Sequence, residues 1–567
     1  MGTIERVHGT ESDRLRPGRY RGSPGPRSVA ARFVSPAHRC CMYTSRSSGW
    51  FLLLLLVLAN DLDARDADRS SGRTPTLTRG ASAESTESDR AQEPRPTPGR
   101  TSAGKPPQQP NFVFVQFEGT GAGWASTSVA MDDRRPEAKA NADRTPHLAA
   151  MAAQGMRFAE FHATAPRCTP TRASFLTGTG AAKLRMTYVN EGGQERRGAR
   201  GEGGGGGGGG GQRGRNGDPE PAAAGTTKLV PPTSVTELPE ATTTIAELLR
   251  PAGYRSAHFG KWHVGRALPS VHGFDEHDGA NTNQGPGRDP KPNPEQAVAI
   301  TDRGLAFAKA QQAAGRPFFL QLSHYGGGSE EEVRPETRQA MAAQVSGRRA
   351  KDTWQAAILH DIDDEVGRLL AGLTELGLAD STYVIVSFDH GASGRDANAP
   401  LRGGKGSVLE GGIRVPFLVR GPGVAGGVCS HVRASACDLL PTLAELAGVA
   451  KWPAEVEGGS LAGVLRGRGV GTVARPHEAF VVHFPHYDLQ STPASAIFLD
   501  DWKLIRSYET DTVQLFDVTA DPEERHDLAA KEPKVVADLQ KRLDAYLRSI
   551  DAGMPTPRAK TAEPRGK

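Results

Sequence analysis

Short apolar runs alternate with amphipathic segments through the middle of the chain. Runs such as "NFVFVQF" (residues 111–117) and "TYVIVSF" (residues 382–388) predict buried strands. The segments between them have apolar residues at helical spacing, and the longest covers residues 356–378. Strands that alternate with helices in this way indicate an α/β fold, with a large sheet covered by helices on both faces.

The pattern changes after about residue 480. Shorter apolar runs follow one another closely, with Asp-Asp and Asp-Thr at the breaks, and a last amphipathic helix is expected over residues 533–550. We therefore expect a main domain over residues 110–470, a small antiparallel α+β subdomain over 471–555 and a disordered tail over 556–567.

The N-terminal part of the chain differs in composition from the rest. The run "WFLLLLLVLA" at residues 50–59 is too short to span a bilayer as a helix and is typical of a signal peptide that ends near Ala59. Met42 would then be a more ordinary start for it. Residues 1–59 are expected to be an extension and signal peptide, and residues 60–109 a disordered linker. The sequence thus predicts an exported protein, periplasmic or secreted, without a stable membrane span.

A second biased tract covers residues 191–226 and contains nine consecutive glycines at 203–211. A phosphate-binding glycine loop needs a strand before it and a Lys-Ser or Lys-Thr pair, and this tract has neither. We expect a disordered insertion in a surface loop.

Charge and cysteine content exclude two classes of protein. A formal net charge of +4 over 567 residues gives no case for a nucleic-acid partner. Five cysteines are too few for a disulfide scaffold. Cys429 and Cys437 could form a disulfide or could be two buried free thiols, and the sequence is compatible with both.

Polar clusters follow several of the expected strands. In open α/β sheets, sites lie beyond the carboxyl ends of the strands. Carboxylates with imidazole can hold a divalent cation, lysines with an arginine can hold an oxyanion, and a cysteine in that field can act as a nucleophile. The residues concerned are Glu118, Lys261, His263, Asp389, His390 and Lys405, together with Cys168 and Arg172.

The stretch "CTPTRASFLTG" at residues 168–178 resembles the Cys-x-Pro-x-Arg signature of the sulfatase family. The motif "GKWHVG" at residues 260–265 is similar to a second sulfatase hallmark, and four further stretches match in order. These are "PLRGGKGSVLEGGIRVPFLVRGPG" (400–423), "DLLPTLAELAG" (438–448), "DWKLI" (501–505) and "LFDVTADPEERHDLA" (515–529). The resemblance covers about residues 110–551 and implies an alkaline-phosphatase-like sheet sandwiched by helices.

The resemblance also implies a mechanism for hydrolysing a sulfate ester. Cys168 would be oxidised by a formylglycine-generating enzyme, and the hydrate of the resulting aldehyde would attack sulfur. Arg172 would orient that diol, and Lys261 and Lys405 would hold sulfate oxygens. His263 would accept the proton that drives elimination and regenerates the aldehyde.

The resemblance further implies one Ca²⁺ held by Glu118, Asp389, His390 and modified Cys168. Relatives usually carry a second aspartate where this chain has Gly119, so weaker Ca²⁺ binding is expected here, and Gly119→Asp is expected to strengthen it.

A histidine of the family is missing near Gly328. With these departures, two alternatives to an active sulfatase stay open. One is a catalytically impaired relative that binds sulfated glycans. The other is a phosphoester or phosphonate hydrolase of the same superfamily.

Overall fold

The structure is a computed structural model, and it describes residues 109–119, 123–140, 144–189, 227–283, 296–326, 332–344, 350–393, 397–488 and 491–559. The expected signal peptide, the linker up to residue 108, the tract at 190–226 and Gly328 lie outside the described residues.

A mixed sheet of eight strands forms the centre of the main domain, in the order β10-β2-β9-β8-β1-β7-β5-β6. Strands β8, β1, β7 and β5 run parallel to one another, and β9 is antiparallel to both β8 and β2. The strands are β1 (Asn111–Phe117), β2 (Met156–Phe158), β5 (Arg255–Gly260), β6 (Glu276–His277), β7 (Phe318–Ser323), β8 (Thr382–Phe388), β9 (Phe417–Arg420) and β10 (Val428–Ser430). The predicted α/β sheet is therefore confirmed.

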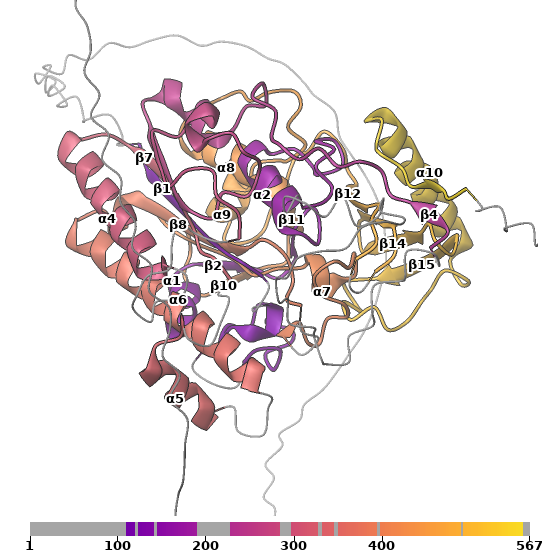
Figure 1. Ribbon diagram of the computed structural model, residues 1–567, viewed down its shortest axis with the longest axis horizontal. Coiled ribbons are helices and arrows are strands. Elements are labelled where there is room, and N and C mark those ends of the chain that lie inside the picture. Colours follow the sequence, from indigo (N-terminus) through magenta and orange to yellow (C-terminus); the bar gives the residue numbers. More distant parts are fainter. Residues whose placement is uncertain are drawn as a thin grey trace, which may run out of the picture. The chain divides into compact units, whose positions relative to one another are not determined.

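Helices cover both faces of this sheet (Figure 1). Helices α1 (Pro146–Gln154), α4 (Ala297–Ala314) and α6 (Ala350–Glu375) pack together on one face, and α5 (Pro335–Gln344) lies against α6. Helices α2 (Cys168–Thr177), α3 (Ile245–Leu249), α8 (Leu439–Leu446) and α9 (Ala462–Arg466) lie on the other. Because both faces are covered, central strand β1 is buried at every residue, as its mainly apolar sequence predicts.

A separate sheet of four antiparallel strands follows in the chain. Its strands are β12 (Phe480–Phe484), β13 (Ala494–Leu499), β14 (Trp502–Ser507) and β15 (Thr512–Asp517). Helix α10 (Pro533–Ser549) covers one face with Leu539, Leu543 and Leu547, which are four residues apart and so share one side of the helix. The other face packs against Val408 and Ile413 of the main domain.

Shorter elements connect these layers. They are β3 (Phe161–His162), β4 (Leu229–Val230), α7 (Glu410–Ile413), β11 (Ala434–Ser435), β16 (Thr556–Pro557) and 3₁₀ turns that include Trp124–Ser126 and Ala436–Asp438. Cys429 on β10 and Cys437 in the last of these turns are both free thiols, so the disulfide considered above is not formed.

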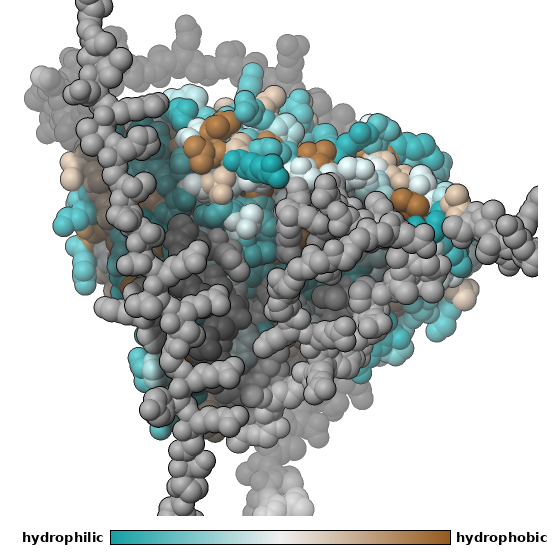
Figure 2. Space-filling model, viewed as in Figure 1, coloured by the Kyte–Doolittle hydropathy of each residue, from teal (hydrophilic) through white to brown (hydrophobic). Residues whose placement is uncertain are grey.

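Among the described helices, none combines the length and the apolar character needed to cross a bilayer. The coloured surface in Figure 2 is mainly hydrophilic, with apolar side chains in small separate groups.

Candidate active site

The carboxyl ends of three central strands meet at one edge of the large sheet. Strand β1 leads into Glu118, β8 into Asp389 and β5 into Lys261. These strands belong to one parallel part of the sheet, in which β8 pairs with β1, β1 with β7 and β7 with β5. The residues that directly follow the strands therefore lie close together. The structure thus places the polar clusters at the carboxyl ends of the strands, where sites lie in open α/β sheets.

Helix α2 brings Cys168 to this edge as its first residue. The preceding residue, Arg167, has an extended backbone with φ −145° and ψ 154°, and every residue of the helix is buried. The side chain of Thr171 donates a hydrogen bond of 2.8 Å to the carbonyl of Ala165, which fixes the turn into the helix. Arg167 itself forms a two-pronged ion pair with Asp488, a partner that lies far away in the sequence.

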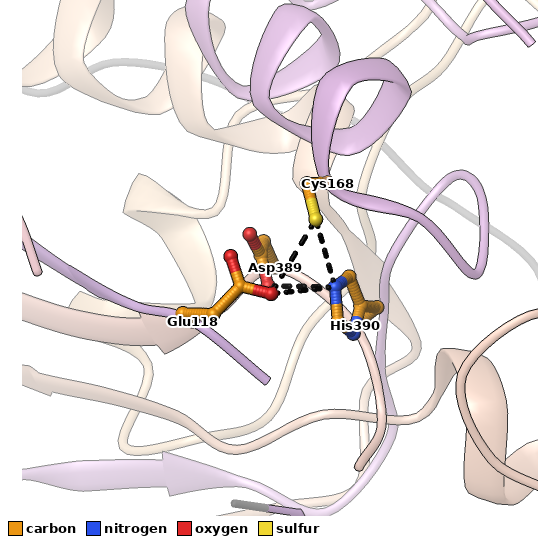
Figure 3. A group of neighbouring side chains, drawn as sticks. All are labelled: Glu118, Cys168, Asp389 and His390. Carbon is orange, nitrogen blue, oxygen red and sulfur yellow. Dashed lines mark hydrogen bonds and ion pairs between the residues drawn. The ribbon is translucent and has the colours of Figure 1, made fainter. Parts of the chain in front are cut away.

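Four side chains converge beneath the helix (Figure 3). His390 Nε2 lies 3.1 Å from Cys168 Sγ and 3.2 Å from Glu118 Oε1. The same nitrogen lies 3.4 Å from Asp389 Oδ1. All four residues are buried. A buried group of two carboxylates, an imidazole and a thiol needs compensating charge to be stable.

Two lysines supply that charge. Lys261 Nζ forms an ion pair with Glu118 Oε2 and donates a hydrogen bond of 2.6 Å to Asn283 Oδ1. Lys405 Nζ lies 3.3 Å from Glu118 Oε1 and 3.8 Å from Cys168 Sγ. Burial works to raise the pKa of Glu118, but the two lysines outweigh it and hold that pKa well below its ordinary value. Glu118 is therefore ionised, and the lysines place positive charge beside residue 168.

The same charges act on the other members of the group. Burial and the Glu118 carboxylate raise the pKa of the Cys168 thiol, but Lys261, Lys405 and His390 bring it well below its ordinary value. Burial disfavours the charged form of His390, yet the Asp389 carboxylate raises its pKa to about 9. The site thus favours an anion at residue 168 and a positive charge among the carboxylates.

Arg172 lies one turn along α2 and holds the strand ends together. Its Nε donates a hydrogen bond of 3.0 Å to Asp389 Oδ2. Its Nη1 donates bonds of 2.9 Å to the carbonyl of Lys261 and 3.2 Å to Gln116 Oε1. The contacts of Arg172 are therefore with the residues around Cys168, and they fix the relative positions of β1, β5 and β8.

His263 follows Lys261 in a strained position. Its φ of 56° lies in the left-handed region, which is unusual for a residue with a side chain. Burial lowers the pKa of its ring, and the neighbouring Cys168 opposes that effect. His263 is thus next to residue 168 and neutral at physiological pH, a state in which it can accept a proton.

His324, after β7, packs its ring against Phe117 with 5.9 Å between centroids, and burial lowers its pKa to about 4. It is not one of the four converging residues.

Gly119 does not leave room for the aspartate of the relatives. Its N–H donates a hydrogen bond of 2.9 Å to Asp389 Oδ1. A Cβ at this position would lie 1.8 Å from the carbonyl oxygen of His390. The tighter Ca²⁺ binding expected of Gly119→Asp therefore stays a prediction, and any side chain there displaces the backbone of a neighbouring ligand-bearing residue.

The residues present fit a divalent cation. The ligand atoms of Glu118, Cys168, Asp389 and His390 all lie within 4.8 Å of one another. Carboxylate oxygens suit hard cations such as Ca²⁺, and imidazole is a common ligand of divalent transition metals. The convergence of three of these side chains on His390 Nε2 also shows where a positive charge is stable.

Sequence reasoning missed several residues that touch the site. Gln116 is a polar residue in an apolar strand, and that break in the pattern was an available signal. Asn283 and Asp488 lie in polar loops, and no local pattern distinguishes them there.

Comparison with known proteins places this geometry in a family. The sequence model described as Sulfatase matches residues 110–449, and the one described as N-sulphoglucosamine sulphohydrolase, C-terminal, matches residues 404–551.

Individual relatives agree with these matches. N-acetylgalactosamine-6-sulfatase of Mus musculus is 29% identical over 389 residues, which are 62% of this chain and 65% of that protein. The match thus covers slightly less than two-thirds of that relative. Arylsulfatase A of Homo sapiens is 29% identical over 444 residues, or 70% of this chain and 76% of that protein.

Solved structures share the fold. The protein Ps i-CgsB, solved in complex with k-i-k-neocarrahexaose, superposes with a TM-score of 0.60 at 20% identity and covers 78% of this chain and 93% of its own. The protein yidJ of Bacteroides fragilis superposes with a TM-score of 0.57 at 19% identity, over 80% of this chain and 98% of its own. With the family model covering residues 110–449 and the fold shared by these structures, the chain belongs to the sulfatase family.

Proposed function

We propose that this chain hydrolyses a sulfate ester of a carbohydrate or aryl compound, with modified Cys168 as the nucleophile. The observation that carries the proposal is the position of Cys168. It begins a buried helix inside the "CTPTR" motif, and two lysines and a cluster of metal-ligating side chains surround it. In the proposed enzyme a formylglycine-generating enzyme converts Cys168, and the hydrated aldehyde supplies the attacking oxygen.

The cations around residue 168 bind the sulfate group in this proposal. Lys405 Nζ is 3.8 Å from the sulfur of Cys168, and Lys261 reaches the opposite oxygen of Glu118. Because ion pairs already hold these positive groups in place, the groups can stabilise the negative charge that develops on the sulfate oxygens without having to move. A divalent cation, with Ca²⁺ as first candidate, would be held by Glu118, Asp389, His390 and residue 168, and it would make the diol more acidic.

Histidine and arginine complete the assignment. His263 takes up the proton that must leave the diol, because burial keeps its ring neutral beside residue 168. Arg172 is a positioning residue, since its hydrogen bonds hold Asp389 and the backbone of Lys261.

The names of the relatives guide the choice of substrate. The mouse relative is named as a sulfatase of N-acetylgalactosamine 6-sulfate, and the human one as an arylsulfatase. We therefore propose that an amino-sugar 6-sulfate and a simple aryl sulfate are the first two substrates to test.

A binding-only relative is the second candidate, and Gly119 favours it. Without the second aspartate, the described cluster offers two carboxylates to a cation. Such a protein would use Lys261, Lys405, Arg172 and His263 to bind sulfated glycans without turning them over.

The test combines mass spectrometry with turnover. The full chain is produced in a host that has the formylglycine-generating enzyme, and the peptide containing Cys168 is weighed. We expect the formylglycine mass and hydrolysis of the sulfates, with little activity on the matching phosphate esters. An unmodified thiol in that host, or bound glycan without turnover, would favour the binding-only candidate. Preferred turnover of phosphate esters would favour the phosphoester hydrolase.

Export belongs to the same proposal, because the apolar run at residues 50–59 is typical of a cleaved signal peptide. N-terminal sequencing of secreted material should begin near residue 60, and a chain that still begins at Met1 or Met42 would contradict it.

A further inference from the structure

A second group of metal-ligating side chains lies at the edge of the large sheet. Cys429 is the middle residue of edge strand β10, and His431 follows that strand. Asp133 comes from the segment after the 3₁₀ turn Trp124–Ser126. The ligand atoms of these three residues all lie within 4.8 Å of one another. Strands β2 and β9 lie between β10 and β8, the strand that leads into Asp389.

Hydrogen bonds already hold the three residues together. His431 Nε2 is 2.9 Å from Asp133 Oδ1. The backbone N–H of Asp133 is hydrogen-bonded to the sulfur of Cys429, and that sulfur lies 3.4 Å from the carbonyl of Met131. His431 Nδ1 is a buried atom for which the described part of the chain provides no hydrogen-bond partner.

The segment that carries Asp133 is held by its neighbour Asp132. The carboxylate of Asp132 is almost fully buried and accepts bonds of 2.9 Å and 3.0 Å from the backbone N–H and Nε of Arg134. It also accepts a bond of 2.8 Å from Nη1 of Arg135. Because this turn is fixed by its own ion pairs, placing Asp133 against β10 costs little additional ordering.

We propose that Asp133, Cys429 and His431 form a second metal site, which takes a zinc-class divalent cation. Thiolate, imidazole and carboxylate are the three ligand types that proteins use for Zn²⁺, and Ca²⁺ does not favour the first two. In a tetrahedral zinc site, neighbouring ligand atoms lie about 3–4 Å apart, so the present spacing needs only a small adjustment. The thiol proton is released to solvent when the sulfur binds the ion.

The exposure of the site completes its description. The side chains of His431 and Asp133 are 35% and 51% exposed, so water reaches the ion and fills the fourth position. The ion would tie the segment at Met131–Arg135 to the edge strand of the sheet. Its effect is therefore on stability, and it does not depend on the proposed sulfatase activity.

The experiment is a titration of the full chain with Co²⁺ and then Zn²⁺ in saturating Ca²⁺. We expect a thiolate-to-cobalt charge-transfer band in the near ultraviolet, one equivalent of ion that Zn²⁺ displaces, and a rise in melting temperature on adding Zn²⁺. Cys429→Ser and His431→Ala should each lose the band and the rise, with sulfate-ester turnover unchanged.

Two matched controls separate this site from other binding. His526 forms a similar exposed pair with Asp521, at 3.2 Å, but none of the described cysteines joins them, so His526→Ala should keep the band and the bound equivalent. Cys168→Ala removes the thiol of the candidate active site and should also keep the charge-transfer band and the bound equivalent of ion. A band that survives in Cys429→Ser, or that is lost in Cys168→Ala, would overturn the proposal, as would Zn²⁺ binding that requires millimolar ion.

Discussion

Two clusters of buried charge in this protein are built from the same residue types and differ in how their charges balance. At the candidate active site, Lys261, Lys405 and Arg172 surround Glu118 and Asp389. The second cluster, which we call the seam cluster, consists of Glu410, Glu524, Lys503, Arg414 and His162, and it joins the main domain to the small sheet.

The seam cluster is closed. Lys503 Nζ lies 2.9 Å from Glu410 Oε1 and 2.7 Å from Glu524 Oε1, with all three side chains inaccessible to solvent. Glu524 Oε2 also accepts a bond of 2.8 Å from the backbone N–H of Glu410, the first residue of α7. Two carboxylates face two cations here, Lys503 and Arg414, and the acids are satisfied within the protein.

The site cluster has Lys261, Lys405, Arg172 and a protonated His390 for two carboxylates. It also contains Cys168, whose modified form must react. The comparison shows what distinguishes a functional cluster from a structural one. In the structural cluster, positive and negative groups pair with each other. The functional cluster keeps an excess of charge opposite in sign to that of its substrate. For a sulfate ester that surplus is positive. The two clusters should therefore respond differently to the same kind of substitution.

The largest expected effect is on turnover at the site. Cys168→Ala should lower sulfate-ester turnover by at least ~10³-fold, because no other group can supply the covalent step. The melting temperature should change little, since the substitution leaves all the ion pairs in place. Steady-state kinetics with an aryl sulfate measures the loss, and Cys437→Ala, at a buried thiol outside the site, is the control. Turnover within tenfold of wild type would contradict the assignment of the nucleophile.

The second effect separates the clusters directly. Lys503→Met leaves two carboxylates buried without their lysine and should destabilise the fold by about 3–5 kcal/mol. Lys261→Met should destabilise it less, because Glu118 keeps Lys405, but should lower turnover by ~10²–10³-fold. Urea unfolding and kinetics on both variants test this. Equal losses of stability would remove the distinction between the two clusters.

More of the fold than of the two charge clusters could be predicted from the sequence. Mainly apolar runs identify the central strands, and a charged residue directly after the run, such as Glu118 or Asp389, identifies the functional edge of the sheet. The seam cluster gave no such signal, because Glu410 and Glu524 are separated by 114 residues and look like surface charges in isolation. Long-range pairing of loops and strands decides their burial, and one sequence contains no local record of it.

The next effect tests the close contact at Gly119. Gly119→Ala should cost about 1–3 kcal/mol and lower turnover, because the new Cβ forces the backbone of His390 to move. Gly463→Ala is the control, since a Cβ there meets nothing within 4 Å and lies in helix α9. It should be neutral or stabilising by up to about 1 kcal/mol. If Gly119→Asp instead bound Ca²⁺ more tightly with unchanged stability, the contact would not limit the site.

The smallest effect is a pH dependence that belongs to the seam cluster. Burial raises the pKa of Glu524 to about 7 against an ordinary value of 4.5, with Lys503 opposing and Glu410 reinforcing the rise. The other charged groups of the cluster are Arg414 and His162, and burial lowers the pKa of His162. Between pH 4.5 and 7 the folded state therefore keeps a proton that the unfolded state has lost. The free energy of unfolding falls as pH rises through this window, by about 3 kcal/mol from this group.

Glu524→Gln should remove that slope, because glutamine resembles the protonated acid at every pH. Urea unfolding at intervals from pH 4.5 to 7.5 measures the difference between variant and wild type. Glu523→Gln, which changes the neighbouring glutamate that pairs with exposed Arg525, should keep the wild-type slope. A wild-type slope in Glu524→Gln would show that the two carboxylates stay ionised around Lys503 across this range. The seam cluster would then be neutral over this whole range, with two carboxylates facing Lys503 and Arg414, and its contrast with the positively charged site cluster would be sharper.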